Sequence, residues 1–113
     1  MATTQTKSII DDALIHEIVG RVLSVARPDK IILFGSAATG KMTRDSDIDL
    51  LITESEPIDR REEYVRIRHA LGGMGYSFDI LFISTDWFED SKNVIGGIAY
   101  PANKYGKVIY EAA

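Results

Sequence analysis

Two aspartates stand two residues apart at the start of an apolar segment, and this spacing suits metal-dependent chemistry. Asp47, Ile48 and Asp49 open a run that continues Leu-Leu-Ile. Because successive side chains of a strand point to opposite faces, Asp47 and Asp49 are expected to project the same way, about 6.5–7 Å apart. Two adjacent carboxylates repel each other unless a cation neutralises them. Mg²⁺ suits such a site because it prefers oxygen ligands and keeps positions open for substrate phosphates.

A second polar feature precedes these acids. Gly35 and Ser36 end an apolar run, and ten residues separate them from Asp47. A Gly-Ser turn at the end of a strand offers free backbone N–H groups, a hydroxyl and the start of a helix, which together favour an anion. Lys41 and Arg44 lie in the same loop and could add positive charge, or simply be solvated. Metal-binding acids beside a phosphate-binding turn indicate nucleotide chemistry.

Asp79 is a third informative acid, because it lies inside the apolar segment 77–84. A carboxylate in such a strand is unfavourable unless it is paired or binds a metal. If this strand neighbours that of Asp47 and Asp49, three carboxylates converge and can hold two metal ions about 3.5–4 Å apart. The alternative is a structural acid at a strand end, bonded to a backbone amide.

Two other phosphate motifs fit less well. Gly35 to Lys41 matches most of a P-loop, but Met42 stands where the Mg²⁺-binding hydroxyl is needed. Only five residues separate Lys41 from Asp47, too few for the helix that follows a P-loop. A phosphatase with an Asp-x-Asp nucleophile is expected to carry Ser or Thr where Leu51 stands, and it leaves the Gly-Ser turn unexplained.

This pattern of residues resembles that of the DNA polymerase β-type nucleotidyltransferase superfamily. It consists of Gly35-Ser36, ten intervening residues, Asp47-Ile48-Asp49 and a later Asp79. More narrowly, the chain is similar to the minimal nucleotidyltransferases of the MntA antitoxin type. The resemblance covers nearly the whole chain. Its larger members carry an extra substrate domain that is not found in this sequence.

This resemblance implies an α/β (α+β) fold with a small mixed sheet of three to four strands and flanking helices. It also implies transfer of a nucleoside monophosphate, AMP from ATP, to an acceptor hydroxyl with two Mg²⁺ ions. The acceptor in the MntA group is a tyrosine of a HEPN-domain (HepT-like) toxin. Asp47 and Asp49 are then expected to bind both metals, Asp79 the catalytic metal and the acceptor hydroxyl, and Gly35 and Ser36 the β- and γ-phosphates.

The loop departs from the family pattern at two positions. Many members of the superfamily read Gly-Ser-Arg-x-Arg-Gly, but this chain has Ala37 and Thr39 where the arginines stand. A second hypothesis, from a different class, is therefore a nucleotide-binding fold with little or no catalysis that neutralises a partner toxin by contact alone.

The length and composition of the chain limit the classes of protein to which it can belong. A chain of 113 residues is expected to form one domain, with residues 1–7 as a flexible tail. There is no cysteine, so disulfides and thiolate metal sites are excluded. No apolar run approaches the length of a membrane span or a signal peptide, which favours the cytoplasm. The net charge of −4 argues against a broad nucleic-acid surface.

The elements that position the acids follow from apolar periodicity. Leu14, Ile18 and Val22 predict a helix that stops at Arg27-Pro28, after a capping box at Ser8. Strands are expected at 30–34 and 47–53, joined too closely for a parallel crossover and therefore antiparallel. A helix is expected over 58–71. The connection that contains it is long enough for a crossover, so the strand at 77–84 is expected to run parallel to the strand at 47–53.

The chain from residue 85 onward is expected to contain short helices and then a strand or packed extension at 107–111. Its apolar residues are interpreted as packing residues, with Trp87 and Phe88 in the core or at a partner contact rather than stacked on a base. These residues are Trp87, Phe88, Val94, Ile95 and Ile98.

Overall fold

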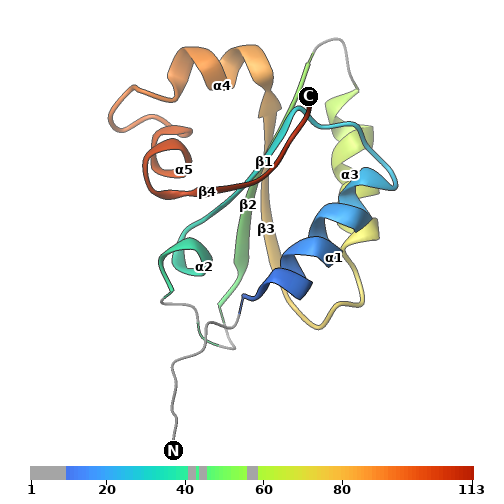
Figure 1. The fold of residues 1–113 in the computed structure, drawn as a ribbon. Helices are drawn as coiled ribbons and strands as arrows, with labels where there is room; N and C mark the ends of the chain where they lie inside the picture. Colours follow the sequence, from blue (N-terminus) through green and yellow to red (C-terminus); the bar gives the residue numbers. More distant parts are fainter. Residues whose placement is uncertain (1–9, 41–42, 44–45, 56–58) are drawn as a thin grey trace, which may run out of the picture.

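The computed structural model describes residues 10–40, 43, 46–55 and 59–113. The predicted flexible tail at 1–7 and the capping role of Ser8 lie outside these residues. The described chain forms a four-stranded mixed sheet in the order β3-β2-β1-β4, with helices on both faces (Figure 1). The strands are β1 (Lys30–Phe34), β2 (Ile48–Glu54), β3 (Phe78–Ser84) and β4 (Lys107–Glu111). The α/β prediction with a small mixed sheet is confirmed.

The pairing of the strands follows the lengths of their connections. β1 and β2 are antiparallel, and β2 and β3 are parallel, as the sequence predicts. Helix α3 (Arg60–Ala70) makes the crossover between β2 and β3, while the short α2 (Ser36–Thr39) follows β1 directly. β4 pairs antiparallel with β1, so the predicted final strand forms and the two outer strands are β3 and β4.

Helix α1 (Asp12–Leu23) begins where Asp11 caps it, because the Asp11 carboxylate accepts a hydrogen bond of 2.9 Å from the Leu14 N–H. The helix ends before the predicted Arg27-Pro28. At Ser24 the side-chain hydroxyl donates to the Arg21 carbonyl at 2.6 Å. Serine competes in this way with the helical ladder, which the apolar period does not reveal.

Helix α3 begins at Arg60, and the predicted start at Ile58 lies outside the described residues. Asp59 caps it by accepting from the Glu62 N–H at 3.1 Å. Ile67 is buried, as predicted for the inner side of this helix, and Leu71 is buried directly after it. The acids of its first turn and the bases of its last turn suit the helix dipole.

The sheet separates two hydrophobic clusters. The larger cluster packs against α1 and α3, and the smaller one packs under α4 (Thr85–Ser91) and α5 (Tyr100–Tyr105) (Figure 1). Strand alternation sends Ile48, Leu50 and Ile52 into the larger cluster and Leu51 into the smaller one. The odd-numbered residues of β2, which include Asp49 and Leu51, therefore face the α4 and α5 side.

The packing prediction for the chain after residue 84 is largely wrong. Phe88 is buried, but Trp87 is 45% exposed and Ile95 is 81% exposed. On this face the buried residues that follow β3 are Phe88, Ala99 and Ala102. The remaining predicted packing residues, Val94 and Ile98, are also exposed.

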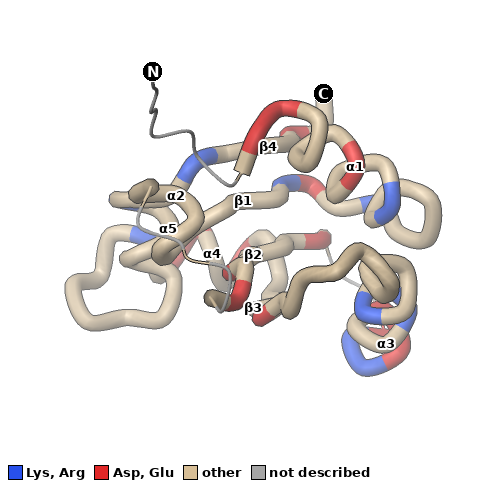
Figure 2. The backbone as a smooth tube through the Cα atoms, turned by 90° about the horizontal axis from the view of Figure 1, so that it is seen from below, with Lys and Arg blue, Asp and Glu red and all other residues tan. Residues whose placement is uncertain are grey.

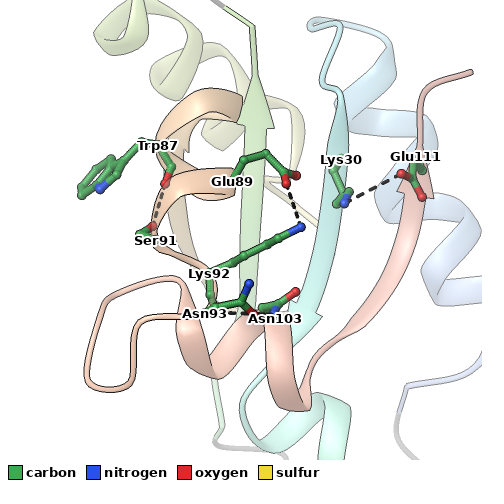
Figure 3. A network of polar contacts seen from close by, with 8 residues as sticks. All are labelled: Lys30, Trp87, Glu89, Ser91, Lys92, Asn93, Asn103 and Glu111. Atoms are coloured by element: carbon green, nitrogen blue, oxygen red, sulfur yellow. Dashed lines mark hydrogen bonds and ion pairs between the residues drawn. The ribbon is translucent and has the colours of Figure 1, made fainter.

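One polar contact links the end of α4 to α5, and another lies within α4 and its C-cap (Figure 3). The Asn103 side-chain amide donates to the Lys92 carbonyl at 3.3 Å, and the Lys92 ammonium pairs with Glu89 at 2.7 Å. This ion pair holds the pKa of the Glu89 carboxyl below its ordinary value. Figure 3 shows the Trp87 ring directed away from this network. Within the described residues, no helix has the length and apolar character to cross a bilayer.

Candidate active site

The three predicted acids lie at the same end of the sheet. Asp49 in β2 and Asp79 in β3 are direct partners in the parallel register, and both belong to the face opposite the α1–α3 core. Asp47 lies just before β2, where the Ile48 N–H donates to the Ser77 carbonyl at 2.8 Å and starts the pairing of the two strands. Figure 2 shows acidic segments side by side at these ends of β2 and β3.

Asp49 is the most buried of the three aspartates. Asp49 is half-buried, whereas Asp47 and Asp79 are exposed. Burial is the main cause that raises the pKa of the Asp49 carboxyl, followed by the negative charges of Asp79 and Asp47. A bound cation relieves this repulsion, because an opposite charge nearby favours the ionised form.

Gly35 lies against the Asp49 side chain. Phe34, the last residue of β1, pairs with Asp49. Gly35 follows with a φ of +71°, in the region that favours glycine. A Cβ atom at this position would overlap Oδ2 of Asp49 and lie 3.1 Å from its Cγ. The turn thus places the Gly35 backbone directly against the Asp49 carboxylate.

Ser36 is the first residue of α2, directly after this turn. The Ala38 and Thr39 N–H groups donate back to the Gly35 carbonyl, so the four-residue helix fixes the Gly-Ser turn. Ala37 is 6% exposed and packs in the larger hydrophobic cluster. The alanine that replaces a family arginine is therefore a core residue here. The candidate nucleotide-binding residues Lys41 and Arg44 lie outside the described residues.

The sequence interpretation missed a cleft beside Asp47. The cleft has a volume of about 420 Å³, and its lining includes Asp47, Arg68 and Tyr76. The Arg68 guanidinium donates to the Phe78 carbonyl at 3.1 Å, which fixes it next to the start of β3. Arg68 lies in the last turn of α3. The only sequence signal was its place in the last turn before the β3 connection.

Carboxylate oxygens are the ligands that Mg²⁺ prefers, and the three aspartates therefore have the right donor chemistry. Among the described residues, no three carboxylate or imidazole side chains converge tightly enough to form a metal site as they stand. The pKa of Asp49 is raised by burial, by the charges of Asp79 and Asp47, and by a side-chain hydrogen bond with Asp79.

Residues 15–99 match the family model of the nucleotidyltransferase domain. The chain belongs to this nucleotidyltransferase family. The matched region contains the Gly35-Ser36 turn and all three aspartates of the candidate site. The nucleotidyltransferase is therefore a transferase by family, and the polymerase β-like fold predicted from its motifs is confirmed.

Solved structures show the same fold. This nucleotidyltransferase superposes on a chain of a toxin–antitoxin complex crystallised with AMP-PNP, with a TM-score of 0.60 and 20% sequence identity. It also resembles a chain of a mutant MntA–HpeT toxin–antitoxin, with a TM-score of 0.52 and 18% identity. Each comparison covers 87% of this chain and 73% of the other. No curated protein matches the sequence significantly.

Proposed function

We propose that this nucleotidyltransferase transfers AMP from ATP to a tyrosine hydroxyl of a HEPN-domain toxin and thereby acts as its antitoxin. The observation that carries this proposal is the pairing of Asp49 with Asp79 on adjacent parallel strands, with the Gly35 turn against Asp49. This arrangement provides metal-ligand oxygens beside a backbone that a triphosphate can approach. AMP transfer and the tyrosine acceptor rest on the family resemblance.

In this proposal, Asp47, Asp49 and Asp79 hold two Mg²⁺ ions, and Gly35 and Ser36 bind the β- and γ-phosphates. The metal ions supply charge neutralisation at the phosphates when bound. Asp79 lies on the β3 side of Asp49, while Gly35 lies on the β1 side. The acceptor hydroxyl is therefore oriented at Asp79, and pyrophosphate leaves towards the Gly-Ser turn, on the opposite side as in-line displacement needs.

The comparisons support the substrate and the partner in this proposal. One similar structure is described as a toxin–antitoxin with AMP-PNP, an ATP analogue, and the other as a toxin–antitoxin. We extend ATP and a toxin partner to this chain because its fold is the same and its three aspartates are present.

The test is incubation of the protein with labelled ATP, Mg²⁺ and the candidate toxin. We expect label on the toxin with the native protein and with Asp90→Asn, a control at an exposed acid of α4. Asp49→Asn is expected to lower the transfer rate at least about a hundredfold, since it removes a ligand of both metals. Equal labelling by Asp49→Asn and the native protein would contradict the proposal.

A second candidate function is neutralisation of the toxin by contact alone. Two observations favour it: Ala37 is packed in the core, so the turn lacks a guanidinium there, and Trp87 and Ile95 are exposed large apolar residues. Toxin neutralisation in cells by Asp49→Asn, as complete as that by the native protein, would favour this function. Loss of neutralisation together with loss of labelling would favour AMP transfer.

A further inference from the structure

Helix α4 and the turns that follow it expose an unusual number of large apolar side chains. Of the eight such side chains that are exposed in the described part of the chain, four lie within residues 87–98. We call these four residues the Trp87 surface: Trp87, Val94, Ile95 and Ile98, which are between 45% and 81% exposed. Single exposed apolar residues are common, but a group of them marks a place of contact with another molecule.

Hydrogen bonds hold the backbone that carries this surface. The Val94 N–H donates to the Ser91 carbonyl at 3.0 Å, and the Gly97 N–H donates to the Val94 carbonyl at 2.9 Å. Position 97 has no room for a side chain, because a Cβ atom there would lie 3.0 Å from the Val94 carbonyl oxygen. Figure 3 shows these turns and the Trp87 ring on the same side, away from the sheet. A partner therefore meets apolar groups on an ordered backbone, which lowers the entropy cost of binding.

The Trp87 surface belongs to the same face of the sheet as the candidate active site, since α4 and α5 cover the side to which Asp49 and Asp79 belong. Asp79 lies near the start of β3, and α4 begins directly after the end of this strand. At about 3.3 Å per strand residue, Asp79 lies about 20 Å from the start of α4. A typical interface of about 800 Å² per partner is roughly 30 Å across. One protein can therefore contact the Trp87 surface and place a side chain at Asp79.

The charge beside these apolar groups is negative. Helix α4 contains three acidic residues and no basic one, and Lys92 at its C-cap pairs with Glu89. Asp86, which directly precedes Trp87, is exposed and forms no ion pair with any described residue. This charge repels nucleic acid and anionic lipid, and a second copy would bring the same acidic helix against itself. A partner with basic residues beside an apolar stripe is complementary to it.

We infer that the Trp87 surface docks a basic amphipathic helix of the protein acceptor. The surface consists of a helix and hydrogen-bonded turns, so it offers no strand edge, and an apolar helix face is the element that it fits. Trp87 supplies the anchor, because tryptophan is among the residues that dominate binding energy at interfaces. The identity of the partner rests on the proposed function, in which a protein acceptor has to be held beside the aspartates. Docking itself needs neither ATP nor metal.

The first test titrates the full-length protein with the blocked helical peptide acetyl-Leu-Lys-Lys-Leu-Leu-Lys-Leu-Leu-Lys-Lys-Leu-Leu-Lys-Leu-amide. Trp87 is the only tryptophan of the chain, so a blue shift of its emission reports burial of this surface. We expect a saturable shift with this peptide and none with its counterpart in which glutamate replaces lysine. Ile95→Ser is expected to weaken binding at least about tenfold. Asp86→Lys is expected to weaken it about threefold at low salt and less at high salt, because salt screens exposed charges.

Val94→Ser and Val65→Ser form a matched pair, because the two valines are 54% and 51% exposed and Val65 lies on α3, across the sheet. We expect Val94→Ser to weaken peptide binding at least about threefold and Val65→Ser less than about twofold. Equal effects of the two variants, equal binding of the two peptides or the absence of a shift would overturn the proposal. A shift with phosphatidylglycerol vesicles but not with the peptide would indicate a lipid surface instead, and dimerisation that Ile95→Ser abolishes would indicate a second copy.

The second test separates docking from catalysis. Calorimetry without ATP measures binding of the candidate toxin, and the labelling assay measures transfer. Ile95→Ser is expected to weaken toxin binding and to raise the KM for the toxin at least about tenfold, with kcat changed less than about twofold. Labelling with an unchanged KM in Ile95→Ser overturns the docking and leaves nucleotidyl transfer intact. Toxin binding that depends on Ile95 but gives no labelling overturns nucleotidyl transfer and leaves the docking intact, and no binding of the toxin to the native protein overturns both.

Discussion

Gly35 and Asp49 are in such close contact that no side chain fits between them. Gly35 continues from Phe34, the β1 partner of Asp49, and turns with a positive φ directly over the carboxylate. A Cβ atom at position 35 would overlap Oδ2 of Asp49. This contact joins the two sequence motifs, the Gly-Ser turn and the Asp-x-Asp pair, at one place in the fold.

Gly35→Ala is expected to lower nucleotidyl transfer at least about tenfold, because the added methyl group must push Asp49 out of place or unwind the turn. The positive φ adds strain, so we also expect a loss of about 1 kcal/mol in the free energy of unfolding. Steady-state transfer rates and urea unfolding measure the two effects. The control is Gly40→Ala, where φ is also positive but a Cβ meets no atom within 4 Å. Equal transfer rates for both variants would show that the Asp49 contact is unimportant.

Asp49→Asn is expected to stabilise the protein in the absence of metal, by about 0.5–1 kcal/mol at pH 7 after allowance for solvent screening. The folded-state pKa of Asp49 is raised, so its charge is less favourable when folded, and this penalty grows as the pH rises above the ordinary value of 3.8. The difference between variant and native protein should close near pH 3. Thermal unfolding with and without Mg²⁺ is the measurement, and Mg²⁺ should stabilise only the native protein. A lower stability of Asp49→Asn at pH 7 would contradict the inferred repulsion.

Glu54 is expected to make stability depend on pH near neutrality. Its pKa is raised from 4.5 to about 7, so its contribution is fully present below about pH 4.5 and is lost as the pH rises through 7. Glu54→Gln should therefore be more stable than the native protein by about 1–3 kcal/mol at pH 8.5, and nearly equal to it at pH 4.5. Urea unfolding across this range tests the sign, with Glu62→Gln as the exposed control. A native protein more stable than Glu54→Gln at pH 8.5 would refute the shift.

Asp29 joins three segments and is expected to stabilise their arrangement. Its Oδ2 accepts hydrogen bonds of 2.5 Å from the hydroxyls of Ser55 and Thr85, and these bonds hold the pKa of Asp29 below its ordinary value. Asp29→Ala should lower the free energy of unfolding by about 1–2 kcal/mol at pH 7. The loss should shrink as the pH falls below 4, because the native carboxylate then takes up a proton and loses its advantage. Asp90→Ala, at an exposed acid, should change stability by less than about 0.5 kcal/mol.

Much of the fold could be predicted because local patterns agree with the tertiary structure. β1 forms at 30–34 as predicted, since this apolar segment is bounded by a proline turn and by Gly35. The antiparallel and parallel pairings followed from connection length alone. The convergence of Asp49 and Asp79 followed from strand alternation once the two strands were taken as neighbours.

The remaining features depend on contacts between distant segments. The exposure of Trp87 and Ile95 could not be predicted, because hydropathy does not report how much sheet area the short helices must cover. Glu54 looks like an ordinary acid at the end of a strand, and only the docking of α3 buries it beside Glu63. The cleft between Asp47 and Arg68 likewise exists only because α3 returns next to β3.

The parallel register of β2 and β3 has a consequence for insertions and deletions. A slip of β3 by one residue would turn Asp79 to the opposite face, towards the larger hydrophobic cluster, and would place an apolar neighbour opposite Asp49. A change in the length of the strand itself is therefore expected to separate Asp79 from Asp49.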